Sequence, residues 1–518
     1  MHYFKKLNDN YFIYAILIFV FLPLNYLPQL QDGVMFSYMY ETGNFSALKL
    51  WYTEISKQIH LLVFYIIDFL VRHTFLPAEI FFDGTAIIFL ILLCFEVKKY
   101  SKFLFGLENK WSNLAALFTA IFPVWHTLVA INISLYVFSI YFLFFGYRNF
   151  ISNNGIKIFI GLLSLIISFN LESNLCFVIG LAFVHLILSK ANNKYDFSLS
   201  KFIRIILISF AYYFLKDIYF PPFGRLEGYN VITIESLVRN LTDVRFINNI
   251  INYSTYLLLY LWLPIIFLLH ISFINKKYIS RNNLNLQKKL NIKRVNNYSL
   301  LLILSVFAVF PYLVVNSWVP SILYLADYYQ RHAFLLAPIF GIFFSTLFRD
   351  MTKINCFENK VNLNFYITIF ICFNLLLLNY GSYRKIESHL FKKNLIAELK
   401  TFGSIPIGNV ELIGRNIPAD LRTFELSYLF YKAYNIAGWW VIHKPFASFN
   451  PPSYILKPPS YILNDIRYSN LFIIKDYKYG CTTRIYLENG PNKYQRIKQF
   501  YIFKYNKYYS IDKIEIKC

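Results

Sequence analysis

The sequence predicts an α-helical polytopic membrane protein with about eleven transmembrane helices, followed by a small α/β or α+β domain. Three observations predict this class. Of the 518 residues, 57% are hydrophobic and 15% are charged, the mean hydropathy is +0.44, and long apolar runs recur up to residue 380 and then stop. Soluble domains have about 45–50% apolar and about 25% charged residues, so this composition indicates a chain that folds in a bilayer.

Eleven apolar runs are candidates for transmembrane helices, because about 20 mostly apolar residues are needed to cross the hydrocarbon core. The first run has no small-residue cleavage site and instead has Pro23 and Pro28 at its end, so we expect a retained anchor and not a signal peptide. The predicted spans are 11–28, 80–96, 112–128, 130–147, 156–171, 173–189, 203–220, 252–273, 299–315, 332–348 and 363–380.

The apolar stretch 59–76 differs from these runs, because it contains Asp68, Arg72 and His73 beside a strong apolar face. Asp68 and Arg72 are four residues apart and would share one face of a helix. Such a helix is expected to lie in the membrane interface and not to cross the bilayer.

The distribution of basic residues predicts the topology. If 59–76 does not cross and the N-terminus is cytoplasmic, the cytoplasmic loops hold 22 Lys and Arg residues and the outer loops hold 8. The loop 274–298 contributes most strongly. This asymmetry follows the positive-inside rule. It predicts a multi-pass protein with a cytoplasmic N-terminus, a first outer loop at 29–79 and an extracytoplasmic C-terminal domain.

Two domains follow from the change in pattern at residue 380. Residues 1–380 form the predicted transmembrane domain, and residues 381–518 form a soluble domain in which short apolar runs alternate with Gly, Pro and Asn. The expected elements of the soluble domain are helices over 384–400 and 421–434 and strands near 409–413, 470–475, 483–488, 499–504 and 511–516.

Several functional classes are excluded or disfavoured. The formal charge of +23 is spread between apolar runs and over the tail, as orientation signals would be, so we do not expect nucleic-acid binding. The six cysteines have no zinc-ligand or disulfide-framework spacing. Walker A, dinucleotide-binding, H-E-x-x-H and G-x-S-x-G sequences are missing, which argues against an ATP-driven pump and a zinc protease. No metal ligands are assigned.

Two acidic residues of the first outer loop are the candidate catalytic groups. Asp32 follows the first predicted span directly, and Glu41 lies in the same loop. A carboxylate at this depth is partly desolvated, and its basicity can then be tuned for proton abstraction. A solvated loop acid that caps the next helix would have the same sequence pattern.

Five further residues near the outer ends of spans are candidate binding groups. Arg331 and His332 precede the tenth span, and an Arg at the interface can bind a phosphate with two hydrogen bonds or can simply extend toward the headgroups. Glu172 lies at the outer turn between spans five and six, where an ionisable group suggests function but helix capping competes. His60 and Arg225 are candidate substrate-binding residues, with structural packing and surface salt bridges as the alternatives.

The arrangement resembles the GT-C superfamily of polytopic glycosyltransferases. Asp32 begins a D-x-x-x-[YF]-type segment and is followed by Gly43, and the interfacial helix at 59–76 is similar to the juxtamembrane helices of that family. The run from Trp111 to Pro123, continuing to Arg148, looks like the family's paired third and fourth spans. Arg331-His332 ahead of a span with Pro338 is similar to the family's late Arg that contacts the donor phosphate.

The resemblance covers residues 1–380 and implies an enzyme of the bacterial inner (plasma) membrane. It implies a hexosyl- or pentosyltransferase that takes sugar from a polyprenyl-phosphate donor for a cell-envelope glycan, lipid or protein acceptor. Asp32 would be the base and Arg331 with His332 would bind the donor phosphate. The family's acid pair is Asp32-Gly33 here, and its His-Pro-Pro is Gln58-Ile59-His60, so the resemblance leaves a divalent metal open.

Two other functions remain as alternatives. An O-antigen polymerase or ligase also has about twelve spans and outer-loop arginines, but it carries its large loop between late spans. A lipid-linked glycan flippase or transporter would show internal repeats and charged residues at the bilayer midplane. The sequence shows neither feature clearly.

Overall fold

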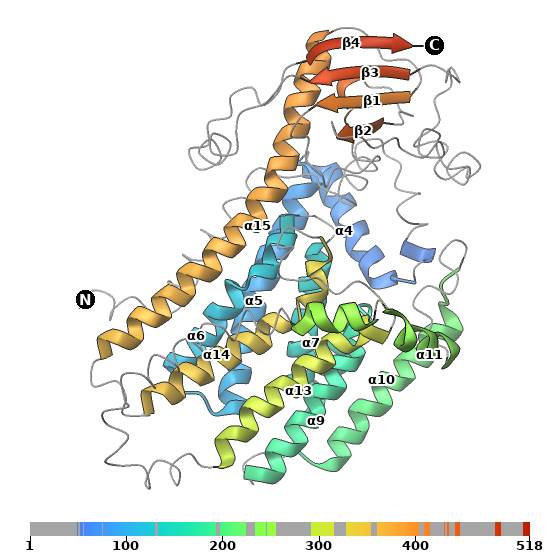
Figure 1. Cartoon of the computed structure of the whole chain (residues 1–518). Helices are drawn as coiled ribbons and strands as arrows, with labels where there is room; N and C mark the ends of the chain where they lie inside the picture. Colours follow the sequence, from blue (N-terminus) through green and yellow to red (C-terminus); the bar gives the residue numbers. More distant parts are fainter. Residues whose placement is uncertain are drawn as a thin grey trace.

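The structure is a computed structural model that describes residues 49, 52–54, 56–74, 76–129, 133–192, 197–223, 234–244, 246–254, 292–314, 328–353, 360–402, 409–414, 429, 432–434, 441–445, 482–487 and 511–517. This part of the chain is a helical bundle joined by one long helix to a small sheet (Figure 1). The helices are α4 Gln58–Thr74, α5 Ala78–Phe105, α6 Asn109–Ala120, η3 Pro123–Val129, α7 Ser134–Phe150, α8 Gly155–Phe169, α9 Ser173–Asn192, α10 Leu199–Tyr219, α11 Ile234–Thr242, α13 Ile292–Val314, η7 Tyr328–Ala333, α14 Leu336–Lys353 and α15 Lys360–Phe402.

Four of the described helical segments are long and apolar enough to cross a membrane. They are Ala78–Phe105, Ser173–Lys190, Asn297–Val314 and Asn364–Tyr383, and the shorter apolar helix is Gly155–Phe169. This composition is that of a helical membrane protein. The predicted spans 11–28 and most of 252–273 lie outside the described residues.

The predicted span 112–128 has a different structure. The 12-residue helix α6 ends at Ala120 and a 3₁₀-helix, η3, begins at Pro123. Pro123 disfavours helical geometry for the residue before it, so a continuous helix cannot pass this point without strain. At 1.5 Å per residue α6 alone is about 18 Å long, which is shorter than the hydrocarbon core.

The helix expected over 59–76 is present as α4. Its buried face contains Leu61, Phe64 and Ile67, whereas Leu62 and Phe69 are each 58% exposed on the opposite face. Asp68 and Arg72 form the i,i+4 ion pair that their spacing predicts, with 2.9 Å between Oδ2 and Nε. An exposed apolar face beside an ion pair suits a helix that lies in a membrane interface.

A series of contacts places several helix ends at the same end of the bundle as the sheet. His126 of η3 packs against Gly381, the middle residue of α15, and α15 runs on to the sheet (Figure 1). Trp125 contacts Phe334 just after η7, with ring centroids 4.8 Å apart. We call this the sheet-side end; it contains α4, η3, η7, the start of α9 and the ends of α10 and α13.

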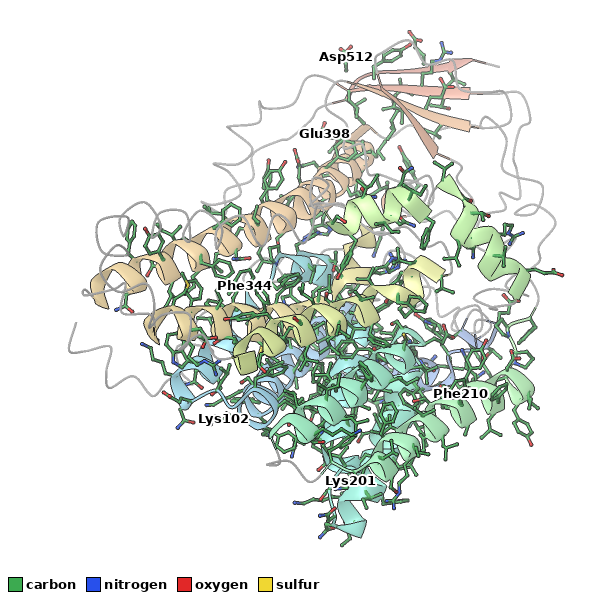
Figure 2. All side chains as sticks on the ribbon, turned by 60° about the horizontal axis from the view of Figure 1, so that its bottom comes forward. Lys102, Lys201, Phe210, Phe344, Glu398 and Asp512 are labelled. Atoms are coloured by element: carbon green, nitrogen blue, oxygen red, sulfur yellow. The ribbon has the colours of Figure 1, made fainter. Side chains whose placement is uncertain are left out.

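The opposite end of the bundle carries largely buried ion pairs, in which the carboxylates are the more deeply buried partners or equally buried. Arg148 donates to Glu96 through Nε and Nη2 at 2.8 and 3.1 Å, and Arg349 pairs with the adjacent Asp350 at 2.9 Å. Figure 2 shows Lys102 and Lys201 at this end, far from Asp512 of the sheet.

The single helix α15 connects the bundle to the sheet without a break. Its 43 residues correspond to about 64 Å, roughly twice the hydrocarbon thickness of a bilayer. The sequence predicts two helices, 363–380 and 384–400, but the 381–383 segment between them is helical. Gly381 fits there because its missing side chain admits the His126 ring; an added Cβ would lie 2.6 Å from Cγ of His126.

The C-terminal sheet is mixed and has the strand order β2-β1-β3-β4 (Figure 1). Strands β1 Asn409–Gly414, β3 Thr482–Leu487 and β4 Ile511–Lys517 confirm three of the predicted strands, whereas β2 Val441–Pro445 was not predicted. β1 is parallel to β2 and β3, and β4 is antiparallel to β3. The strands predicted at 470–475 and 499–504 lie outside the described residues.

Helices α7 and α8 pack backbone against backbone, which leads to a testable prediction. A Cβ added at Gly161 would lie 2.3 Å from the backbone nitrogen of Phe150. Because neither backbone can move independently, Gly161→Ala should lower the free energy of unfolding by about 1–3 kcal/mol. Denaturation with sodium dodecyl sulfate in mixed micelles measures this change.

The control for this substitution lies on the same helix. Gly155 begins α8 and has no atom within 4 Å of its virtual Cβ. Gly155→Ala should therefore change stability by about 0.5 kcal/mol or less. Equal losses in both variants would contradict the close approach of α7 and α8.

Candidate functional site

Arg331 and His332 lie in a polar cluster at the sheet-side end of the bundle. Both belong to η7, and the His332 ring is stacked on Tyr312 of α13, with centroids 4.3 Å apart and an interplanar angle of 18°. The Arg331 guanidinium is close enough to Tyr312 to interact with its hydroxyl electrostatically. His332 is 7% exposed, so its stacking on Tyr312 helps to fix the position of η7, which also carries Arg331.

Glu172 joins the same cluster from the turn between α8 and α9. The Tyr312 hydroxyl donates to Oγ of Ser173 at 3.1 Å, and Glu172 is near enough to act on Tyr312 electrostatically. Lys216, in the last turn of α10, forms an ion pair with Glu172. The sheet-side cluster therefore consists of Glu172, Ser173, Lys216, Tyr312, Arg331 and His332, and it brings together three of the residues that the sequence indicates.

His60 lies at the edge of this cluster and joins α4 to α7. Its Nε2 is 3.2 Å from Oγ of Ser139, and the side chain is 2% exposed. Burial lowers the pKa of His60 well below 6.5, and the positive charges of Lys57 and Lys216 lower it further. In the described structure His60 is thus a neutral packing residue, and its predicted substrate contact stays a prediction.

The low pKa of His60 predicts how stability depends on pH. The folded protein keeps the imidazole neutral, whereas the unfolded chain binds a proton below about pH 6.5. The unfolded state therefore binds more protons, and stability is lost as the pH falls from 7 through 6.5 toward the folded-state pKa, by at most about 1.4 kcal/mol per pH unit.

A His60→Asn variant checks this expectation. It cannot take up a proton, so its midpoint of thermal unfolding should fall less between pH 7 and pH 5 than that of the unchanged protein. The same slope in both proteins would show that other groups cause the pH dependence.

An apolar cavity of about 550 Å³ adjoins the sheet-side cluster. Its volume is in the range of about 300–1,000 Å³ that is usual for ligand pockets. α8 and α10 form the walls and the beginning of α4 forms the rim. The lining residues are Ser56, Gln58, Ile59, Leu162, Ile166, Asn170, Ile208, Ala211, Tyr212, Leu215, Lys216, Tyr219 and Phe220.

The outer surface of α10 next to this cavity is strongly apolar. Leu215 and Tyr219 line the cavity and are themselves 54% and 69% exposed. Phe210, on the opposite face of α10, is 53% exposed and is labelled in Figure 2 on the side of the bundle away from α15. Exposed aromatic side chains of this kind suit contact with lipid chains. The cavity therefore lies where a lipid can reach it from the side of the bundle.

Polar groups are concentrated at the sheet-side end of the cavity. Asn170 is 2% exposed, and its Nδ2 has no hydrogen-bond acceptor among the described residues. Lys216 lines the same cavity and pairs with Glu172. Ser56 donates to the carbonyl of Phe220, which ties the segment before α4 to the end of α10.

Two buried carboxyl groups at the sheet-side end of α5 were not found from the sequence. Glu79 and Asp83 are one helical turn apart and are 4% and 5% exposed. Neither carboxyl oxygen of Asp83 has a hydrogen-bond partner within the described part of the chain. Their only signal in the sequence is acidic residues at i and i+4 at the start of an apolar run.

The remaining candidates are not placed. Asp32, Glu41 and Arg225 lie outside the described residues. Among the residues that are described, no group of three or more His, Cys, Asp or Glu side chains could hold a metal ion.

Comparison with known families, curated proteins and solved structures found no match for this chain. The functional conclusion is therefore based on the residues themselves: a cationic and aromatic cluster at the sheet-side end of a membrane-type bundle, with an apolar cavity beside it.

Proposed function

We propose that this chain is a membrane glycosyltransferase that transfers a sugar from a polyprenyl-phosphate donor to a cell-envelope glycan, lipid or protein acceptor. In this proposal the chain has about eleven spans and a cytoplasmic N-terminus in a bacterial inner membrane, and the α6–η3 segment crosses as an interrupted helix that is buried in the bundle. The sheet-side end and the C-terminal domain are extracytoplasmic.

One observation carries the proposal. Arg331 and His332, which the resemblance implies for donor-phosphate binding, lie in one cluster with Lys216, and Lys216 also lines the apolar cavity between α8 and α10. A polyprenyl phosphate needs these two environments side by side, because its phosphate requires cations and its chain requires apolar surface.

The proposed reaction is a direct displacement at the anomeric carbon of the sugar. An acceptor hydroxyl forms the new bond to this carbon while the bond from the carbon to the phosphate oxygen breaks. The acceptor proton passes to Asp32, and the polyprenyl phosphate leaves with the electron pair of the broken bond. Arg331 stabilises the charge that develops on the leaving phosphate.

The test is sugar transfer in membranes that contain the protein. Radiolabelled polyprenyl-phosphate sugars are supplied with and without an envelope extract as acceptor, and the unchanged protein is compared with Asp32→Asn. The amide cannot accept the proton, so we expect a loss of about 100-fold or more in transfer.

Two results would count against the proposal. Equal transfer by both proteins would remove Asp32 from the reaction. Movement of the labelled lipid between the leaflets without transfer to any acceptor would favour a flippase.

A further inference from the structure

The Lys216–Glu172 ion pair lies between the apolar cavity and the aromatic side chains of the sheet-side cluster. On one side Lys216 lines the apolar cavity together with Asn170. On the other side Glu172 lies beside Ser173 and near Tyr312, which stacks on His332. The side chains of Lys216 and Glu172 are only 12% and 26% exposed, so the pair is largely shielded from solvent.

A partly buried ammonium group needs an anion close to it, because an uncompensated charge at such a site is costly. In the structure Glu172 provides this anion. An entering ligand with its own negative charge could pair with Lys216 only if it competes with the carboxylate.

The cavity indicates what this ligand is. Its walls are aliphatic and aromatic side chains such as Ile166, Ile208 and Leu215, so most of the ligand is apolar. Two polar residues, Lys216 and Asn170, line it at one end. The Asn170 Nδ2 is buried beside the cavity and has no acceptor among the described residues. Two donors at the end of an apolar cavity suit a phosphate on a hydrocarbon chain.

We propose that Glu172 is an exchangeable counter-ion, which holds Lys216 in the empty protein in place of the phosphate of an isoprenoid lipid. When the lipid binds, Lys216 moves from the carboxylate to the phosphate and Asn170 donates to a phosphate oxygen. The carboxylate thus competes with the ligand, and lipids without a phosphate do not displace it.

This inference rests on the proposed function for the identity of the lipid, but its test measures binding and not transfer. Farnesyl phosphate is the probe, with farnesol and dioleoyl phosphatidic acid as comparison lipids. The full chain in detergent is titrated with each lipid, and the dissociation constant is measured by intrinsic fluorescence or by the shift of the thermal midpoint.

The two partners of the ion pair should have opposite effects. Glu172→Gln removes the competing anion and should bind farnesyl phosphate about fivefold or more tightly. Lys216→Met should weaken binding about tenfold or more, because a charge-assisted hydrogen bond is lost.

Two further variants test the charge and the amide. Lys216→Arg keeps the charge and should retain most of the affinity. Asn170→Leu should weaken binding of the phosphate but not of farnesol.

The control is Lys201→Met, at the opposite end of the same helix, which should bind as the unchanged protein does. Unchanged or weaker binding by Glu172→Gln, in a variant with an intact thermal transition, would overturn the proposal. Farnesol binding as tightly as farnesyl phosphate would also overturn it, and so would equal competition by phosphatidic acid, which would make this a phospholipid site.

The two proposals can fail separately. Transfer by the unchanged protein with no effect of Glu172→Gln on binding would remove the counter-ion role and leave the enzyme class intact. The expected binding pattern without transfer from any donor would leave the lipid site and remove the glycosyltransferase activity.

Discussion

In the proposed glycosyltransferase reaction, Arg331→Ala should reduce the turnover number for sugar transfer by about 100- to 1,000-fold, with a smaller effect on the Michaelis constant of the donor. The expected size follows from the position of Arg331 in η7, beside the stacked rings of Tyr312 and His332 at the sheet-side end of the bundle. Charge develops on the donor phosphate only as the bond to the sugar breaks, so the loss should appear mainly in turnover. Initial rates at varied donor concentration measure both constants.

The substitution Arg331→Lys separates charge from geometry. An ammonium group keeps the positive charge but cannot form the two parallel hydrogen bonds of a guanidinium. It should therefore recover only part of the lost activity. Recovery to the full rate would show that charge alone is needed.

Arg72→Ala is the control for this experiment. Arg72 is also basic and lies on α4, but its side chain is 61% exposed and pairs with Asp68. Exposed ion pairs contribute about 0–1 kcal/mol, so neither the fold nor the rate should change more than about twofold to threefold. Similar losses in both arginine variants would mean that any positive charge near the interface supports transfer, and Arg331 would lose its assigned role.

The sequence was sufficient to predict that several candidate residues lie at the same end of the helical bundle. Glu172, Arg331 and His332 each follow or precede an apolar run, and the count of basic loop residues assigns all three to one side. The structure places them in one cluster because the ends of helices on one side of a bundle are limited to a thin layer. The prediction therefore needed no knowledge of which helices are neighbours.

The partners of these residues could not be predicted, because they depend on helix packing. Lys216 is visible as a basic residue at the end of an apolar run, but nothing in hydropathy says that α10 lies beside the α8–α9 turn. The same holds for Tyr312, which meets Ser173 across 139 positions of the chain. Helix pairing is decided by the shapes of the packed faces, such as the close approach at Gly161.

The limits of the prediction in the C-terminal domain have a similar cause. β1, β3 and β4 were predicted because each contains a short apolar run in a segment punctuated by Gly, Pro and Asn, whereas β2 is the short sequence Val441-Ile-His-Lys-Pro445, which ends in proline. Its position at the edge of the sheet explains why proline is tolerated. The continuous helix α15 was predicted as two because apolar content falls after residue 380, yet helical geometry does not require apolar residues outside a bilayer.

Two buried carboxyl groups on α5 should respond differently to replacement by leucine: Glu96→Leu should destabilise the protein, and Asp83→Leu should not. Glu96 is 2% exposed and accepts hydrogen bonds from Arg148 and from Lys99 at 2.7 Å. Glu96→Leu leaves Arg148 beside an apolar side chain and should lower the free energy of unfolding by about 2–4 kcal/mol, the smaller value reflecting the partial exposure of Arg148.

Asp83 is 5% exposed, and neither of its carboxyl oxygens has a hydrogen-bond donor in the described residues. Asp83→Leu should therefore leave stability unchanged or raise it by about 1–3 kcal/mol, because an unsatisfied polar group is replaced by an apolar one of similar size. Denaturation with sodium dodecyl sulfate under identical conditions measures both variants. A loss of stability for Asp83→Leu as large as that for Glu96→Leu would contradict this and would mean that the Asp83 carboxyl is paired. The rate of sugar transfer by Asp83→Leu is then measured in the same assay as above. If this variant is more stable than the unchanged protein but transfers less sugar, the Asp83 carboxyl contributes to the reaction and lowers the stability of the fold.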